Sequence, residues 1–149
     1  MRFTPKTAKE IAEMRILPDG EYPFQITSAV DKVSSKGNDM IEVWMRVFKP
    51  DGNFIQVVDY LMESMAYKLR HACEATGLID RYESGQLQPD ELVEKTGMLK
   101  LTTQKGTGGY SDKNVVKDYI VSGEAVKLPV NKNDLIANLT TDPNDEIPF

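Results

Sequence analysis

Hydrophobic and polar residues alternate along two neighbouring segments, residues 40–48 and 53–60, which the turn sequence Lys-Pro-Asp-Gly separates. A period of two residues is typical of a half-exposed β-strand, and a Pro-Asp-Gly turn between two such segments favours an antiparallel hairpin. One face of the first segment is entirely aliphatic: Ile41, Val43, Met45 and Val47. We expect that face in the core, and the hairpin over residues 38–60 as the centre of the fold.

The opposite face of the first segment carries two aromatic rings and a guanidinium group, which belong to Trp44, Phe48 and Arg46. Such side chains can form a flat, partly cationic platform of the kind on which the bases of a single nucleic-acid strand stack. The alternative is that another part of the chain covers this face and buries Trp44.

Alternating segments also flank the hairpin and predict further strands. Residues 21–33 form a first strand that is long enough to bend across two sheets. Residues 98–104 form a fourth strand in which Leu99 and Leu101 face inward, and residues 114–122 form a fifth.

The period of two also assigns faces within the other strands. One face of the first strand is expected to carry Tyr22, Phe24, Ile26, Ser28 and Val30. One face of the fifth is expected to carry Val115, Lys117, Tyr119 and Val121. In the third strand we expect Ile55 and Val57 in the core, although Phe54, Val58 and Tyr60 compete for the interior.

Helical spacing occurs between the third and fourth predicted strands. Residues 64–76 have apolar side chains at intervals of three and four residues, and Gly77 ends the pattern. This helix is expected to plug one end of a barrel. Pro89 begins a second short helix. Before the first strand, residues 4–14 have only a weak apolar stripe, which predicts a short helix or arm packed on the barrel.

The order of these elements predicts a mainly β fold. Five strands with a helical insertion between the third and fourth are the layout of an OB-fold, a partly open Greek-key barrel whose second and third strands bind oligonucleotides. The predicted domain, with its N-terminal arm, covers residues 1–122. A linker over residues 123–141 and an acidic tail over residues 142–149 follow.

The chain of 149 residues has a net charge of −5, and its negative charge is unevenly distributed. No lysine or arginine follows Lys132, whereas four of the 23 acidic residues do: Asp134, Asp142, Asp145 and Glu146. The remaining 19 acidic residues nearly balance the 18 basic ones, so a near-neutral body carries an acidic end. The absence of a long apolar run or a signal peptide, together with a single cysteine, indicates a cytoplasmic protein.

The sequence shows no catalytic or metal-binding machinery. His71 and Cys73 lie two residues apart on a predicted helix, so their side chains point to nearly opposite sides and cannot share a metal. The glycine-rich residues 105–110 lack the Gly-Lys-Ser/Thr ending of a phosphate loop and are interpreted as a hairpin loop. We find no nucleophile beside a base and no cofactor motif, and therefore expect neither an enzyme nor a cofactor.

The candidate binding residues follow from these elements. Stacking of bases is assigned to the aromatic residues Trp44, Phe48, Tyr60 and Tyr110. Contact with phosphates is assigned to the basic residues Arg46, Lys36, Lys100, Lys105, Lys113 and Lys117. The loop between the last two strands commonly contacts nucleic acid in an OB-fold, so Tyr110 and its neighbouring lysines can close over a bound strand.

The last ten residues are polar and acidic until they end on Ile147, Pro148 and Phe149. This ending, Asp-Glu-Ile-Pro-Phe, resembles the acidic tip of bacterial-type single-stranded DNA-binding proteins. The body is similar to small phage proteins of that function, from Leu-Pro-Asp-Gly-Glu-Tyr at residues 17–22 to Asp-Lys-Asn-Val-Val-Lys-Asp-Tyr at residues 112–119. The linker is much shorter than in the bacterial proteins, which favours a monomer or dimer over a tetramer.

The resemblance implies a function and a set of partners. Such a protein coats single-stranded DNA during phage replication or recombination in the cytoplasm of a bacterial host. The implied docking site for replication or recombination proteins is the tip: Asp145, Glu146, Ile147, Pro148 and Phe149. The rival hypothesis is an OB-fold adaptor whose platform binds a protein instead of DNA.

Overall fold

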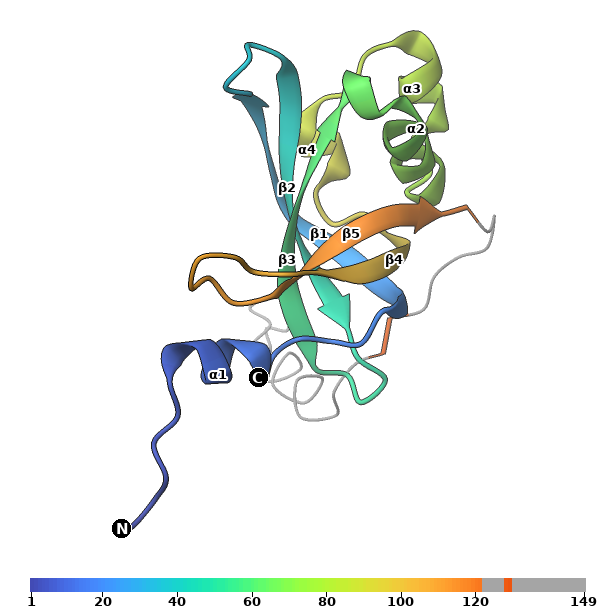
Figure 1. Cartoon of the computed structure of the whole chain (residues 1–149). Coiled ribbons are helices and arrows are strands. Elements are labelled where there is room, and N and C mark those ends of the chain that lie inside the picture. Colours follow the sequence, from blue (N-terminus) through green and yellow to red (C-terminus); the bar gives the residue numbers. More distant parts are fainter. Residues whose placement is uncertain (122–127, 130–149) are drawn as a thin grey trace, which may run out of the picture.

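The computed structural model describes residues 1–121 and 128–129, and its helices and strands are labelled in Figure 1. The elements are, in chain order, α1 (Ala8–Glu13), β1 (Gly20–Val33), β2 (Asp39–Phe48), β3 (Phe54–Met62), η1 (Glu63–Met65), α2 (Ala66–Ala75), α3 (Ile79–Ser84), α4 (Pro89–Leu92), β4 (Thr96–Gln104) and β5 (Lys113–Ile120). The prediction of a mainly β protein with helices between the third and fourth strands is confirmed.

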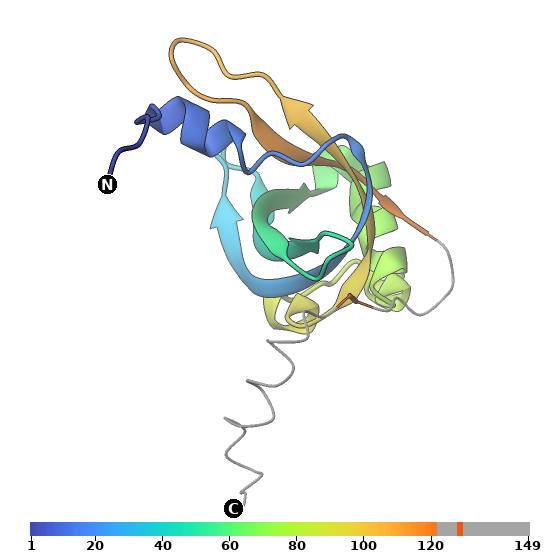
Figure 2. The same ribbon diagram turned by 90° about the horizontal axis from the view of Figure 1, so that it is seen from below.

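The five strands form one antiparallel sheet in the order β3-β2-β1-β4-β5. Seen along its axis, the sheet curls around a central core (Figure 2). Its two edge strands, β3 and β5, share no backbone ladder within the described residues, so the sheet is open. Helices α2 and α3 lie together at one side of this curl (Figure 1).

The central hairpin has the predicted pairing and faces. Its turn is closed by the Lys49 N–H, which donates to the Asn53 carbonyl at 2.7 Å, and Gly52 has a φ of 90° that glycine adopts without strain. The aliphatic face is buried in full: Ile41, Val43, Met45 and Val47. On β3, Val57 is buried and Ile55 packs against the same core, so the assignment of this strand's inner face is confirmed.

A β-bulge corrects the predicted faces of β1. Ile26 pairs with Met45 and Ser28 with Trp44, which leaves Thr27 as an extra residue on β1. A bulge inverts the alternation beyond it. Ser28 and every second residue after it therefore face outward, and the prediction that Ser28 and Val30 share one face with Ile26 is wrong.

A second bulge corrects β5. Leu101 pairs with Val116 and Lys100 with Asp118, so Lys117 is the extra residue. Val116 and Tyr119 are consequently both buried although three positions separate them. The predicted face, which placed Lys117 and Tyr119 together, is wrong for this reason.

The predicted helix after β3 is confirmed as α2, and Gly77, with a φ of 79°, ends it in the left-handed conformation. Its residues Ala72 and Cys73 are buried against the core. The short helix predicted at Pro89 is α4, and α3 was not predicted.

The N-terminal arm, residues 1–16, is held by its own capping box but does not pack on the sheet. Thr7 Oγ1 accepts from the Glu10 N–H at 3.1 Å, and the Thr7 N–H donates to the Glu10 carboxylate at 3.0 Å. The side chains of Phe3 and Met14 are 72% and 69% exposed, so the expectation that the arm packs on the barrel is wrong.

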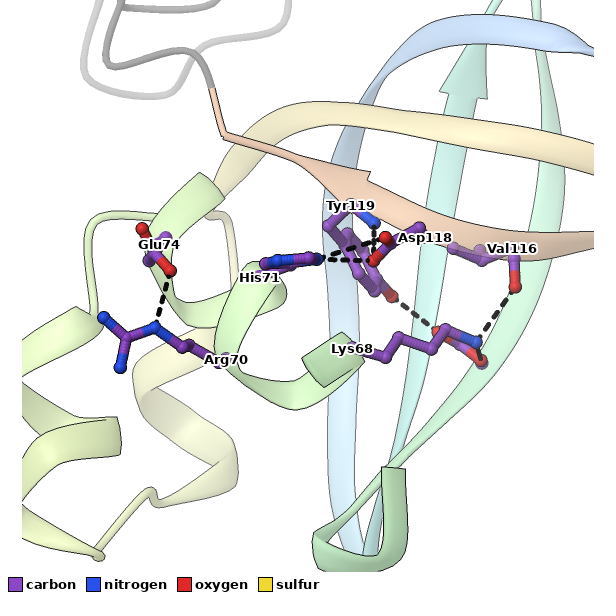
Figure 3. A network of polar contacts seen from close by, with 8 residues as sticks. Lys68, Arg70, His71, Glu74, Val116, Asp118 and Tyr119 are labelled. Carbon is purple, nitrogen blue, oxygen red and sulfur yellow. Dashed lines mark hydrogen bonds and ion pairs between the residues drawn. The ribbon is translucent and has the colours of Figure 1, made fainter. Parts of the chain in front are cut away.

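A buried polar network joins the two edges of the sheet (Figure 3). The Lys68 ammonium on α2 donates to the Asp59 carboxylate on β3 at 2.8 Å and to the Val116 carbonyl on β5 at 2.9 Å. The Tyr119 hydroxyl on β5 donates to the other oxygen of Asp59 at 2.7 Å. Side chains therefore connect β3 to β5 where the backbone ladder does not.

Tyr119 stays protonated in this network. Burial raises the pKa of its hydroxyl well above the ordinary tyrosine value, and the adjacent Asp59 carboxylate raises it further because a second negative charge there is unfavourable. The hydroxyl is thus a permanent donor to Asp59 in the physiological pH range.

Removal of Asp59 tests the importance of this network. Asp59→Ala leaves the Lys68 ammonium buried without a counter-charge, so we expect a loss of about 3 to 5 kcal/mol in the free energy of unfolding. Tyr119→Phe removes one hydrogen bond and leaves the ion pair, with an expected loss of about 1.5 to 3 kcal/mol. Urea unfolding followed by circular dichroism measures both. A smaller loss for Asp59→Ala than for Tyr119→Phe would contradict this account.

Candidate nucleic-acid interface

The outward-facing side of β1, β2 and β3 carries an exposed aromatic surface, which we call the outer face. It is formed by Ser28, Val30, Glu42, Trp44, Arg46, Val58 and Tyr60. Trp44 lies between its register partners on β1 and β3 and is 37% exposed. Tyr60, 40% exposed, is the register partner of Glu42. The alternative that the chain covers Trp44 does not hold for the described residues.

A carboxylate lies on the outer face beside Trp44 and Tyr60. The Trp44 indole N–H donates to Glu42 Oε1 at 3.0 Å, and the Lys32 ammonium lies 4.0 Å from the same oxygen. The indole hydrogen bond is the main reason that the pKa of Glu42 is lowered, and the interaction with Glu42 raises the pKa of Tyr60. Glu42 thus fixes the indole orientation and places a negative charge beside both rings.

Phe48 does not belong to the accessible platform. It is only 8% exposed, because its register partner Phe54 packs edge-on against it with ring centroids 5.8 Å apart. Phe54 is the exposed ring at this position, and the Arg46 guanidinium lies 4.6 Å from its centroid. The expectation that Phe48 presents a stacking surface is corrected: Phe54 takes that place, with Arg46 held over it by a cation–π contact.

The loop between β4 and β5, residues 105–112, is organised by an acidic residue. Asp112 accepts from the Gly106 N–H at 2.9 Å and from the Lys105 ammonium at 3.3 Å, and these bonds lower its pKa. Lys105 is therefore already paired. Tyr110, at the tip, is exposed, as is Lys36 in the β1–β2 loop. The β4–β5 loop projects on the side of the sheet away from α2 and α3, whereas the β1–β2 loop lies at the same end of the molecule as these helices (Figure 1).

The three remaining lysines are exposed but lie elsewhere on the sheet. Lys100 on β4 stands between its register partners Glu21 and Asp118, both acidic. Lys113 begins β5 and Lys117 is its bulged residue. None of the three is a register neighbour of β2 or β3, so the sheet does not bring them together with Trp44.

The residues predicted to bind a partner protein, Asp145, Glu146, Ile147, Pro148 and Phe149, lie outside the described residues. The predictions made for them therefore remain predictions.

Within residues 1–121, no three histidine, cysteine or acidic side chains are grouped so that they could hold a metal ion. His71 Nδ1 lies 3.0 Å from a carboxylate oxygen of Asp118 (Figure 3). Cys73 is fully buried, and burial raises the pKa of its thiol to about 11. None of the described helices has the length and apolar character needed to cross a membrane.

Comparison with known proteins identifies no family or relative: no family model matches the chain, and no curated protein is significantly similar to it in sequence. The resemblance to phage single-stranded DNA-binding proteins therefore remains a prediction from short motifs, and the function is argued from the outer face itself.

The bond between Trp44 and Glu42 makes the indole a reporter of pH. Because the pKa of Glu42 is lowered, its carboxylate stays ionised through its ordinary titration range, and the hydrogen bond is lost only as pH falls through the lowered pKa. We expect the emission of Trp44 to change in that acidic range, before circular dichroism reports unfolding. Glu42→Gln, which cannot titrate, should abolish the change. The same acid transition in Glu42→Gln would contradict the assignment.

Proposed function

We propose that this protein binds single-stranded DNA, largely without sequence preference, by stacking bases on the outer face of β1 to β3. The observation that supports this most strongly is the exposed, hydrogen-bonded Trp44 between two exposed aromatic positions, Tyr60 and Phe54, with Arg46 beside them. Aromatic surfaces beside cations bind single strands without reading sequence, because every base has a π-face.

We further propose that the curled sheet is an OB-fold barrel. Its strand order, its helices between β3 and β4, and its open edge between β3 and β5 agree with a five-stranded, partly open Greek-key barrel. In that fold the second and third strands and the loops of residues 34–38 and 105–112 form the binding surface. Trp44, Arg46 and Tyr60 lie on those two strands.

The charges of the outer face suggest the course of the DNA backbone. Glu42 repels phosphates, so bases and not phosphates are expected beside Trp44 and Tyr60. Arg46 at one end of the face and Lys36 in the β1–β2 loop are the expected phosphate contacts. Lys105 can join them as well, because its exposed pair with Asp112 is weak and can be exchanged for a phosphate.

In this proposal the protein coats single strands that are exposed during phage DNA replication or recombination in the host cytoplasm. Residues 1–122 form the binding domain, and the tip at residues 145–149 recruits partner proteins. The assignment of the tip rests on its sequence: a phenyl ring next to a carboxylate suits an apolar pocket lined with basic side chains.

Truncation of Trp44 tests the stacking surface. Trp44→Ala should weaken binding to fluorescently labelled oligo-dT by about 1 to 3 kcal/mol, the range for loss of one stacked base, while the domain stays folded. Fluorescence anisotropy gives the affinity and circular dichroism gives the fold. Tyr67→Ala on α2 is a matched control, because Tyr67 is also an exposed aromatic residue but lies off the outer face. Unchanged affinity of folded Trp44→Ala would overturn the proposal.

Arg46 provides a separate test through the salt dependence of binding. If Arg46 neutralises one phosphate, Arg46→Ala should reduce the slope of log affinity against log salt by about 0.7, the value for a single strand. Arg70→Ala is the control, because Arg70 is paired with Glu74 on α2 (Figure 3). If the slope equals that of the wild type, Arg46 does not contact a phosphate of the bound strand.

Deletion of Phe149 tests the proposed role of the tip. Because the ring and the terminal carboxylate are expected to bind the partner together, the truncated protein should lose capture of replication or recombination proteins from host lysate. Its affinity for oligo-dT should be unchanged. Capture of the same proteins by both forms, or a lower melting temperature of the truncated form, would contradict a docking tip.

A further inference from the structure

A groove of about 980 Å³ opens at one end of the curled sheet, between the ends of β1 to β3 and helices α2 and α3. Its walls are mainly apolar and include Val33, Ile41, Leu61, Leu69, Tyr82 and Leu87. Val33 is 65% exposed within the described residues, although it is aliphatic. An apolar groove of this size is large enough for several side chains of a peptide segment.

The free charges at the groove are negative. Asp31, Asp39 and Glu63 line it, are exposed, and form no ion pair with a basic side chain of residues 1–121. The two basic residues of the lining are already engaged: Arg81 contacts Asp80 and Glu91, and Lys32 faces Glu42. The groove therefore disfavours a polyanion such as DNA and favours a basic segment with apolar side chains.

The N-terminal arm of this same chain has the complementary composition. Residues 1–16 carry four basic side chains, Arg2, Lys6, Lys9 and Arg15, against two acidic ones, Glu10 and Glu13. Its large apolar side chains are exposed: Met1, Phe3, Ile11 and Met14. Ile11 and Met14 are three residues apart and so share one side of the helical turn. Among the described residues nothing covers this apolar side.

The arm and the groove lie at opposite ends of the molecule. Figure 1 shows α1 below the curled sheet, whereas α3 and the β1–β2 loop, which flank the groove, lie at its top. Figure 2, seen from below, shows α1 at the rim of the curl, beside the loop between β4 and β5. The arm thus projects away from the groove of its own molecule and is available to a neighbouring one.

We propose that the N-terminal arm of one copy binds in the acidic, apolar groove of the next copy. The contact joins different surfaces of the two copies, so an assembly that does not close into a ring ends with one free arm and one free groove and can grow as an open chain. Burial of Phe3, Ile11 and Met14 provides the attraction, and the opposite charges set the direction.

The contact does not depend on the proposed binding of DNA, but DNA would strengthen it. In solution the association is a bimolecular step. Copies bound to neighbouring sites on one strand face each other at a high effective concentration, which promotes the same contact without any new interaction. A weak association in solution would therefore become a cooperative one on a long strand.

Charge reversal on each side tests the contact in the absence of DNA. Sedimentation velocity at low salt, over a range of protein concentrations, should show reversible association of the wild type. Arg2→Glu with Lys6→Glu in the arm, or Asp39→Lys with Glu63→Lys in the groove, should each weaken the association at least about tenfold, because like charges then meet. An equimolar mixture of the two variants should restore the association, because each arm then meets a groove of opposite charge only on the other variant, so the two variants alternate along the assembly.

Asp90→Lys with Glu94→Lys is the matched control, since both acidic residues are exposed and neither lines the groove. This variant should associate like the wild type. A wild type that sediments as a single non-associating species would overturn the inference, as would a mixture that fails to associate. The inference would also be overturned if the association were lost on deletion of residues 142–149 and not on charge reversal in the arm, because the tail would then occupy the groove. Because DNA is absent, these outcomes are independent of the proposed function.

Discussion

The contact between the Asp59 carboxylate and the Lys68 ammonium holds the two edges of the sheet in place. The strands β3 and β5 lack a shared backbone ladder, so the curl of the sheet is maintained at this point by side chains that converge from β3, α2 and β5. A buried ion pair contributes little net free energy to folding, because both charges lose their hydration. Here it also joins three elements, because Lys68 on α2 donates to Asp59 on β3 and to Val116 on β5, and Tyr119 on β5 donates to Asp59.

The candidate interface depends on this closure and on the bulge at Thr27. The bulge turns Ser28 and Val30 outward beside the hairpin, so that three strands contribute to one exposed surface. Trp44 is then exposed, but its indole is held in one orientation because its N–H donates to Glu42. An oriented, accessible ring loses less conformational freedom when a base stacks on it.

Much of the fold could be predicted because it depends on local pattern. The alternation in β2 identified its buried face, and the turn at Gly52 identified the hairpin. The bulges at Thr27 and Lys117 could not be predicted, because each is defined by the register of the partner strand. The sequence likewise gives no sign that the residues Asp59, Lys68 and Tyr119 meet, since they come from three separate elements.

The candidate site was predictable to a similar extent. Trp44, Arg46 and Tyr60 were assigned to an exposed face by alternation and lie there. Phe48 was misassigned because its burial depends on Phe54 across the hairpin. The hydrogen bond from Trp44 to Glu42 could have been predicted, because residues two apart on a strand lie on the same face. The acidic register partners of Lys100 depend on the pairing of β4, and the ion pair of Lys105 with Asp112 depends on the path of the loop, so neither could be predicted.

The emission of Trp44, the only tryptophan of the chain, allows the central claim to be measured on the unmodified protein. Titration with oligo-dT should quench this emission, with a midpoint that moves to higher DNA concentration as salt is added. Inorganic polyphosphate of equal charge should leave the emission unchanged, because it offers phosphates but no bases to stack. Absence of quenching by oligo-dT, or equal quenching by polyphosphate, would contradict base stacking on the outer face and would favour the protein adaptor.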